Sequence, residues 1–234
     1  ADPHWIDVFG ERMILQLPDD MSDPPPDEDH PGYAYLMQFM DGNRIDLTLY
    51  PLERLSDMEE DSLTLALLDK DGILSAYPAP SEGGYLPKPP TLKAYADCCN
   101  EFWWCAPYAA KGLWRKQILY AKAMIEEALR VELMKMLRWY IGIQTGFRIN
   151  PGKMGKYFEQ YLDSGTWQML LATYADAGYE STWDELESLA GLFRSVAQQV
   201  GAHFGYPYPA DDDARVSAHL RHVRALPADA KEMY

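Results

Sequence analysis

The segment 183–204, WDELESLAGLFRSVAQQVGAHF, decides the fold of the longer part of this chain. Its large apolar residues recur at spacings of three and four positions. They are Trp183, Leu186, Leu189, Phe193, Val196, Val200 and Phe204. Side chains with this spacing lie on one face of an α-helix. The sequence therefore predicts an amphipathic helix whose single apolar stripe needs partner helices to cover it.

The pattern stays helical on both sides of this segment. Thr91 is placed to cap a helix, and Pro107 predicts a kink or a new first turn before a further long helical stretch. Residues 210–226 begin with acidic residues, which the helix dipole favours at an N-terminus. We therefore predict an all-α helical bundle over residues 86–234.

The first part of the chain has strand patterns instead. Residues 12–18 are a candidate strand, and two extended runs on either side of Asp41-Gly42 predict a β-hairpin. The proline-spaced stretch 75–91 is typical of a linker. The predicted fold class is α+β, with a small sheet domain over residues 1–85 followed by the bundle.

The strand RIDLTLYP, residues 44–51, carries one unexpected acid, Asp46. Ile45, Leu47 and Leu49 fall on one face by the period of two, which leaves Asp46 on the polar face. A carboxylate in this position is solvated, paired with a cation or part of a functional site. The residues alone leave these alternatives open, including an edge-strand aspartate that faces solvent and pairs with Arg44.

The net charge of −15 is concentrated in the first part of the chain. Residues 1–90 hold 19 acidic residues against five Lys and Arg, which predicts that nucleic acid is not a partner. Residues 111–156 hold ten Lys and Arg against three Glu. An acidic part next to a basic helical region suits a site that holds a cation on one side and a polyanion on the other, although solvated helix faces give the same pattern.

Other features concern the cellular compartment. Cys98, Cys99 and Cys105 have no metal-site spacing, and we expect buried free thiols in a reducing compartment. No apolar run reaches the roughly 18 to 20 residues of a membrane span, and the first ten residues lack a signal-peptide pattern. We expect a cytoplasmic protein without a membrane partner.

Six blocks of the chain, in order, resemble a known family. They are WIDVFGERMILQ, DGNRIDLTLYPLE, LLDKDG, DCCNEFWWCAPYAAKGLWRKQILYA, MLRWYIGIQTGF and GKMGKYFEQYL. They resemble the successive blocks of bacterial streptomycin adenylyltransferases, the aminoglycoside 6-adenylyltransferases, over essentially the whole chain. That family belongs to the polymerase-β-like nucleotidyltransferases, which transfer AMP from ATP to a drug hydroxyl. The resemblance implies an antibiotic-resistance enzyme in which residues 1–85 form the C-terminal part of a nucleotidyltransferase sheet domain.

The resemblance also implies a role for Asp46. In that superfamily three carboxylates from neighbouring strands hold one or two Mg²⁺ ions, which clamp the triphosphate, and one carboxylate activates the attacking hydroxyl. Asp46 in IDLTL matches the third carboxylate. The implied roles of Asp46 are Mg²⁺ ligand and general base.

Two superfamily signatures do not match this chain. It contains no Gly-Ser pair, and its D-x-D pairs, Asp27/Asp29, Asp69/Asp71 and Asp211/Asp213, fit loops or helix caps better than a central strand. Family members also have a segment before their counterpart of DPHWIDVFGER. We therefore expect residues 1–234 to be the C-terminal portion of a longer enzyme, inactive as a fragment.

The helical block NEFWWCAPYAAKGLWR holds the remaining candidate site residues. The resemblance favours Lys111 and Arg115 as nucleotide-binding residues that neutralise the triphosphate. Glu101, with Asn100 and Trp104, is a candidate for binding the drug, because a carboxylate pairs with the guanidinium groups of streptomycin. Aromatic residues such as Trp104 also occur frequently in a helical core.

Two other functions remain open. The chain can be a catalytically inactive nucleotidyltransferase relative that binds a cationic ligand or a partner, or a helical interaction domain without a small-molecule site. The sequence does not predict an oligomeric state.

Overall fold

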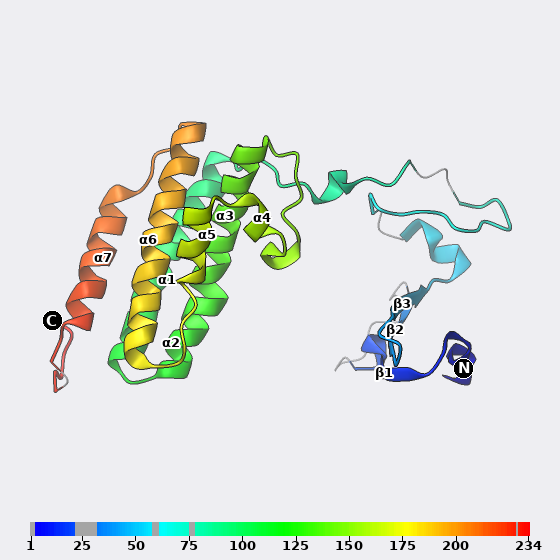
Figure 1. Ribbon diagram of the computed structural model, residues 1–234, viewed down its shortest axis with the longest axis horizontal. Coiled ribbons are helices and arrows are strands. Elements are labelled where there is room, and N and C mark those ends of the chain that lie inside the picture. Colours follow the sequence, from blue (N-terminus) through cyan, green and yellow to red (C-terminus); the bar gives the residue numbers. More distant parts are fainter. Residues whose placement is uncertain (1–2, 22–31, 58–60, 75–77, 228) are drawn as a thin grey trace. The chain divides into compact units, whose positions relative to one another are not determined.

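The structure, a computed structural model, describes residues 3–21, 32–57, 61–74, 78–227 and 229–234. The chain divides into two compact units, Ala1–Pro80 and Ser81–Tyr234. The first contains a small sheet, and the second is helical (Figure 1). The α+β fold class predicted from the sequence is confirmed.

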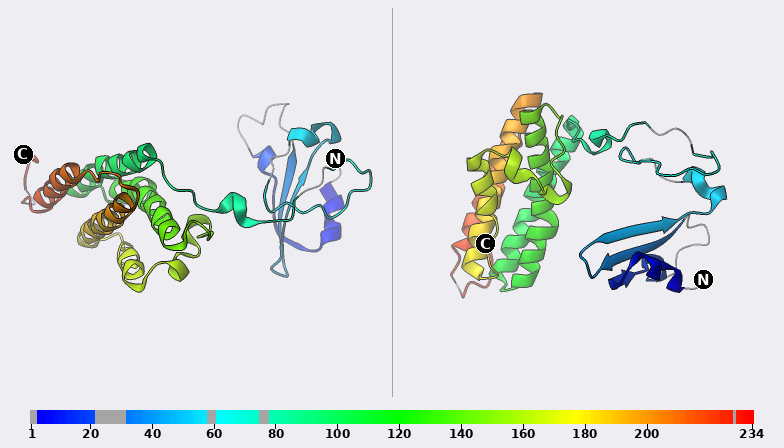
Figure 2. Two further views of the ribbon diagram at one scale, coloured as in Figure 1. Left: turned by 90° about the horizontal axis from the view of Figure 1, so that it is seen from above. Right: turned by 45° about the vertical axis from the view of Figure 1, so that its right-hand side comes forward.

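The sheet has three antiparallel strands in the order β1-β2-β3. They are β1 (Arg12–Gln16), β2 (Tyr33–Phe39) and β3 (Arg44–Leu49). The predicted hairpin consists of β2 and β3, as Figure 2 shows. In its turn the Asn43 backbone N–H donates to the Asp41 carboxylate at 2.9 Å, and Gly42 has a φ of 85°, which a residue without a Cβ adopts easily. Within the described residues β3 is an edge strand.

One face of the sheet carries a small core. Its buried residues are Ile6 of the 3₁₀ helix η1 (Pro3–Phe9) and Tyr35, Met37 and Phe39 of β2. The Trp5 ring meets the Tyr35 ring edge to face, with 5.4 Å between centroids. Because side chains alternate along a strand, the residues between them, such as Leu36, lie on the opposite face. In the strand register Leu36 is paired with Asp46, so Asp46 lies on that opposite face.

The second unit is a bundle in which α1, α3, α6 and α7 are the long helices (Figure 1). The helices are α1 (Leu92–Trp114), α2 (Ile118–Met124), α3 (Arg130–Thr145), α4 (Phe158–Tyr161), α5 (Ser164–Leu171), α6 (Tyr179–Phe204) and α7 (Ala210–Arg224), with a π-helical turn, η5 (Ile125–Leu129), between α2 and α3. Short 3₁₀ helices are η2 (Pro18–Asp20), η3 (Leu52–Asp57), η4 (Glu82–Tyr85) and η6 (Lys153–Gly155). Among the described residues, no helix combines the length and apolar composition that crossing a membrane requires.

Helix α1 begins as predicted but does not restart at its proline. The Thr91 hydroxyl accepts a hydrogen bond from the Ala94 backbone N–H at 3.1 Å, which caps the helix. Pro107 lies inside α1, so the prediction of a new first turn there is wrong. Proline removes one helical hydrogen bond. Buried residues on both sides of it, Ala106 and Ala109, anchor the two halves of α1 in the same core.

The helical stretch predicted after Pro107 is interrupted by a chain reversal at residues 115–117. Lys116 takes the left-handed conformation with a φ of 58°, and the Gln117 backbone N–H donates to the Gly112 carbonyl at 2.8 Å. Gly112 permits the close packing of α2, because a Cβ at this position would lie 2.8 Å from Cδ1 of Tyr120. The turn itself contains neither Gly nor Pro, so no residue in it predicted a chain reversal.

Helix α6 supplies the predicted apolar stripe. Its residues from Trp183 to Val200 on this stripe are buried, and Phe204 is half-buried. Phe193 stacks on Phe102 of α1 with 3.8 Å between ring centroids. Each fully buried side chain of this size contributes roughly 1.5–3 kcal/mol. This stripe accounts for the position of α6 at the centre of the bundle.

The three cysteines all lie on α1 and are buried and free, which confirms the predicted free thiols. Burial raises the pKa of Cys99 to about 12. Burial and the nearby Glu101 raise the pKa of Cys105 to about 11. The thiols are therefore protonated at neutral pH and pack as small apolar groups.

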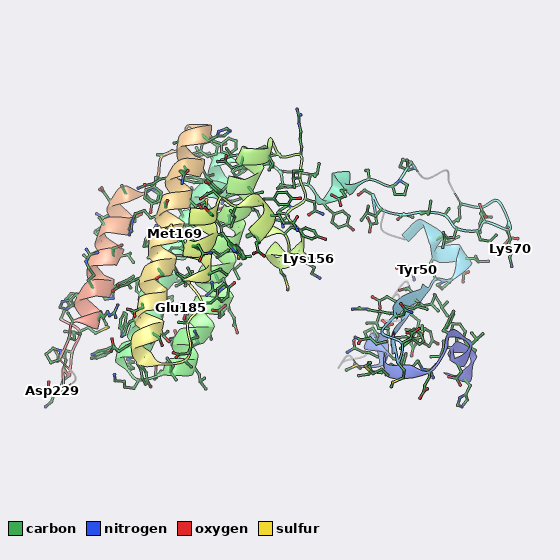
Figure 3. The ribbon with its side chains drawn as sticks, in the orientation of Figure 1. Tyr50, Lys70, Lys156, Met169, Glu185 and Asp229 are labelled. Carbon is green, nitrogen blue, oxygen red and sulfur yellow. The ribbon has the colours of Figure 1, made fainter. Side chains whose placement is uncertain are left out.

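An ion cluster centred on buried Arg130 and Glu185, with half-buried Lys122 and exposed Glu126, joins several helices. Arg130 Nη2 donates to Glu185 at 2.9 Å, and Lys122 Nζ donates to the other oxygen of Glu185 at 2.6 Å. Arg130 also donates to Glu126 at 2.6 and 2.9 Å and to the Thr173 carbonyl at 2.7 Å. Glu185, labelled on α6 in Figure 3, has a fully buried side chain. The cluster connects α2, η5, α3, α6 and the segment after α5.

Candidate active site

Asp46 lies on β3, on the sheet face that the small core leaves uncovered. The alternation predicted from the sequence is present, because Ile45 and Leu47 pack against the core while Asp46 and Thr48 are exposed. Asp46 is opposite Leu36 in the strand register. An edge strand with an exposed carboxylate is accessible to a ligand from solvent.

The Asp46 carboxylate is held by one neighbour on the same strand. Arg44 Nε and Nη2 donate to its two oxygens, each at 2.7 Å, in a bidentate pair. The hydrogen bonds that Arg44 donates to Asp46 raise the pKa of Arg44. The side chains are 59% and 46% exposed, so solvent screens the pair and its net strength is small. The sequence had left this Arg44 pair open as one alternative, and the geometry does not exclude a functional role for Asp46.

The described residues do not assemble a complete metal site. They contain no group of three His, Cys, Asp or Glu side chains arranged to hold a metal ion. Asp69 accepts hydrogen bonds from the backbone N–H groups of Ile73 and Leu74, so the Asp69/Asp71 pair belongs to a loop, as predicted. Asp27 and Asp29 lie outside the described residues. Among the described residues, Asp46 is therefore not part of a cluster of three such side chains.

Two of the predicted drug-binding residues, Asn100 and Trp104, line one cavity with α7. We call this cavity of about 280 Å³ the α1–α7 groove; its lining residues are Asn100, Trp103, Trp104, Asp212, Arg215 and Val216. Trp104 is 63% exposed, whereas Trp103 belongs to the core. The α7 residues were not predicted. Their only sequence signal was the spacing of three between Asp212 and Arg215, which allows an ion pair on one helix face.

A buried hydrogen-bond network supports the wall of the groove. Asp213 accepts two bonds from Arg194 at 2.6 Å, one from Tyr208 at 2.7 Å and one from Ser217 at 2.8 Å. Burial alone would raise the pKa of Asp213, but these hydrogen bonds and the Arg194 charge hold it below its usual value. Asp213 thus fixes α7 on α6, a role beyond the favourable first-turn charge predicted for it.

The Trp103 indole N–H has no hydrogen-bond partner among the described residues. Burial raises the pKa of Tyr208, and the nearby Trp103 indole acts in the opposite direction. The Tyr208 hydroxyl is itself committed to Asp213, and the indole does not reach it with the geometry of a hydrogen bond. Because this nitrogen is sealed from solvent, Trp103 supports the groove from the core and does not offer its N–H to a ligand there.

The other helical candidates do not join this groove. Glu101 accepts a hydrogen bond from the Cys105 thiol at 3.3 Å and is exposed. Arg115 follows the end of α1 and lines a different cavity, of about 360 Å³, with Lys116, Trp183 and Arg224 among its neighbours. Lys111 is half-buried one helical turn before Arg115. The predicted site residues of the bundle are therefore distributed over at least two surfaces.

Comparison with known proteins connects these residues to one family. The sequence profile of a family described as streptomycin adenylyltransferase matches residues 1–223. The chain is 41% identical over 214 residues to the aminoglycoside 6-adenylyltransferase of Campylobacter jejuni, covering 91% of this chain and 74% of that protein. It is 39% identical over 207 residues to the aminoglycoside 6-adenylyltransferase of Staphylococcus aureus, covering 88% of this chain and 73% of that protein.

The fold is similar to a solved structure as well. The crystal structure of an aminoglycoside 6-adenyltransferase from Bacillus subtilis aligns with a TM-score of 0.57 and 33% sequence identity. The alignment covers 97% of this chain and 83% of that one. The resemblance seen in six blocks of sequence is therefore confirmed at the level of the whole chain.

Proposed function

The chain belongs to the streptomycin adenylyltransferase family, and from this premise we propose that it transfers AMP from ATP to a hydroxyl group of streptomycin. Adenylyl transfer to an aminoglycoside is the activity of the family, and the chain is an enzyme of this class. The proposal adds the donor, ATP, and the acceptor, streptomycin. The observation that carries it is the family match over residues 1–223.

Asp46 is the proposed general base. In the reaction the drug hydroxyl attacks the α-phosphorus of ATP and forms a new P–O bond. The P–O bond between the α- and β-phosphates breaks, and pyrophosphate leaves. The hydroxyl proton needs an acceptor, and an exposed carboxylate on a rigid strand suits this role. Arg44 must release the carboxylate first. Opening an exposed pair of this kind costs at most about 1 kcal/mol, so the pair is compatible with the role.

Mg²⁺ is the proposed metal, with Asp46 as one of its ligands. When bound, Mg²⁺ stabilises the negative charge that develops on the phosphoryl oxygens. Its octahedral shell requires several oxygen ligands, and the described residues supply no group of three. We propose that nucleotide oxygens, water and groups outside the described residues complete the shell.

Lys111 and Arg115 remain the proposed nucleotide-binding residues, because Lys111 lies in the last turn of α1, Arg115 directly follows that turn, and together they can neutralise a leaving pyrophosphate. Asn100, Trp104 and Glu101 remain the proposed drug-binding residues. The acidic net charge of −15 supports small-molecule substrates rather than a nucleic-acid partner. Free buried thiols and a reaction that consumes ATP support a cytoplasmic setting.

The test uses the gene product that contains residues 1–234, incubated with ATP, Mg²⁺ and streptomycin. We expect pyrophosphate release that depends on streptomycin, and adenylylated drug in the mass spectrum. No streptomycin-dependent release of pyrophosphate under these conditions would contradict the proposal.

A binding protein without catalysis is the second candidate function. The observation that favours it is the bidentate Arg44 pair, which occupies both oxygens of Asp46. Streptomycin binding by the whole gene product, without pyrophosphate release under any tested metal, would support this alternative. Transfer of AMP would exclude it.

A further inference from the structure

The α1–α7 groove has the size of a subsite for a single ring. Its volume of about 280 Å³ is below the range of about 300–1,000 Å³ typical of sites for drug-sized ligands. Its lining combines two indoles, an amide, a carboxylate and a guanidinium. Such a mixture does not match a purely apolar ligand. It matches a compact ring that carries both a cation and hydrogen-bonding groups.

The carboxylate in the groove already contacts one guanidinium. Arg215 Nη2 donates to one oxygen of Asp212 at 2.9 Å. The two side chains are 71% and 54% exposed, so the pair is weak and open to exchange with solvent or ligand. A ligand guanidinium can therefore replace Arg215 on Asp212, and it can bind both carboxylate oxygens in a bidentate geometry.

An exposed indole lies beside this carboxylate. Trp104 is 63% exposed, and its ring meets Tyr108 edge to face with 6.4 Å between centroids, which fixes its orientation. The face of an indole attracts cations, and a planar guanidinium can stack on it while it also pairs with a carboxylate. The neighbouring Trp103 is buried and forms part of the same wall.

The charge at this wall favours a cation. The first turn of α7 holds Asp211, Asp212 and Asp213. Two guanidinium groups face them, since Arg194 pairs with Asp213 and Arg215 pairs with Asp212. One negative charge is left in excess, and it exceeds the roughly half positive charge that the helix dipole places at this terminus.

We propose that the α1–α7 groove is a subsite for the guanidinium-bearing, hydroxylated ring of streptomycin. Asp212 is the ion-pair partner of one guanidinium, and Trp104 is the surface on which it stacks. The choice of streptomycin rests on the proposed function, whereas the preference for a guanidinium rests on the groove alone. The groove thus contributes selectivity against aminoglycosides that carry amines only.

The first experiment is calorimetric titration of streptomycin into the 234-residue chain at low and moderate salt. Asp212→Asn should weaken binding by about ten- to a hundredfold, the usual cost of losing a charged hydrogen-bond partner. Asp211→Asn removes the same charge from the same helical turn but does not line the groove, so it should leave affinity within about twofold. Trp104→Ala should weaken binding by about two- to fivefold. Equal effects of the two aspartate variants would overturn the proposal.

A second pair of measurements separates a ligand contact from a packing defect. Arg215→Gln should tighten streptomycin binding, because it removes the internal competitor for Asp212, and a structural defect would weaken it instead. Kanamycin, which has amines but no guanidinium, should bind more weakly than streptomycin and should not respond to Asp212→Asn. Weaker binding by Arg215→Gln, or an equal response with kanamycin, would contradict the assignment of Asp212.

The Trp104 contact has its own readout. In a ¹⁵N-labelled chain, streptomycin should move the indole N–H resonance that disappears in Trp104→Phe. An unmoved resonance, or no streptomycin binding by the chain, would overturn the proposal. Neither result would touch the proposed function, which depends on pyrophosphate release by the gene product. Conversely, loss of transfer with binding retained in the groove would overturn the proposed function alone.

Discussion

The two units of this protein each contain an arginine paired with a carboxylate, and the two pairs differ most in their surroundings. Arg44 and Asp46 are joined at 2.7 Å on an open sheet face, with side chains 59% and 46% exposed. Arg130 and Glu185 are joined at 2.9 Å inside the bundle, with side chains 8% and 0% exposed. Water competes for the first pair and is excluded from the second. The same chemical pair can therefore hold a fold together or keep a carboxylate accessible for chemistry.

The largest expected effect concerns catalysis by the exposed pair. In the gene product that contains residues 1–234, Asp46→Asn should lower adenylyl transfer by about 10²- to 10⁴-fold, because the general base is lost. The isosteric amide should leave the unfolding transition nearly unchanged. Initial rates of pyrophosphate release measure the effect. Glu11→Gln removes an exposed carboxylate from the same unit and serves as the control. Near-native turnover by Asp46→Asn would mean that Asp46 forms a surface ion pair and is not the general base.

The next effect concerns the stability of the bundle. Arg130→Met removes one of the two cations that neutralise the buried Glu185 carboxylate. Breaking a buried pair in this way typically lowers the free energy of unfolding by about 3–5 kcal/mol. Urea denaturation of the 234-residue chain, followed by tryptophan fluorescence, measures this free energy of unfolding. A loss below about 1 kcal/mol would mean that Lys122 alone compensates Glu185, and the contrast between the two units would disappear.

A smaller effect should appear in the pH dependence of stability. The pKa of Asp213 is lower in the folded protein than in the unfolded chain, because the bonds from Arg194, Tyr208 and Ser217 outweigh burial. The stabilisation is therefore complete above the unfolded pKa of about 3.9 and is lost as the pH falls through the folded pKa. Urea midpoints of wild type and Asp213→Asn should differ at pH 7 and converge in acid. A constant difference down to the acid limit would contradict this assignment.

The smallest effect concerns the contribution of the exposed Arg44–Asp46 pair to stability. Arg44→Gln breaks the exposed pair, and the free energy of unfolding should change by no more than about 1 kcal/mol, as for other solvent-screened pairs. The same urea experiment applies. A loss comparable to that of Arg130→Met would show that exposure does not distinguish the two pairs, and would undermine the view that Asp46 is free for chemistry.

Local patterns predicted the elements of this fold, and long-range contacts explain what they missed. The α6 stripe and the β2–β3 hairpin follow from periodicity and from a turn dipeptide. The reversal at Lys116 was missed because a lysine, rather than a glycine, takes the left-handed conformation there. The Arg194–Asp213 bond joins residues on two helices, and no local spacing encodes it.

In the candidate site, too, local patterns predicted some features and long-range contacts explain the others. The position of Asp46 on an exposed strand face follows from alternation alone, and its bond to Arg44 was one of the alternatives that the sequence left open. Asn100 and Trp104 were proposed from their helix, but their neighbours on α7 depend on how two helices more than a hundred residues apart in sequence pack together. Helix packing of this kind is decided by the whole core.

The buried cysteines of α1 can report how often the bundle opens. Cys98 and Cys99 have fully buried thiols, and a modifying reagent reaches them only when α1 separates from its neighbours. If opening is fast compared with modification, the labelling rate in the absence of denaturant reports the free energy of that opening. The sheet unit has no cysteine and therefore gives no labelling signal in this measurement. Alkylation can therefore follow the integrity of the helical unit alone, in the intact protein and under the conditions in which it binds its ligands.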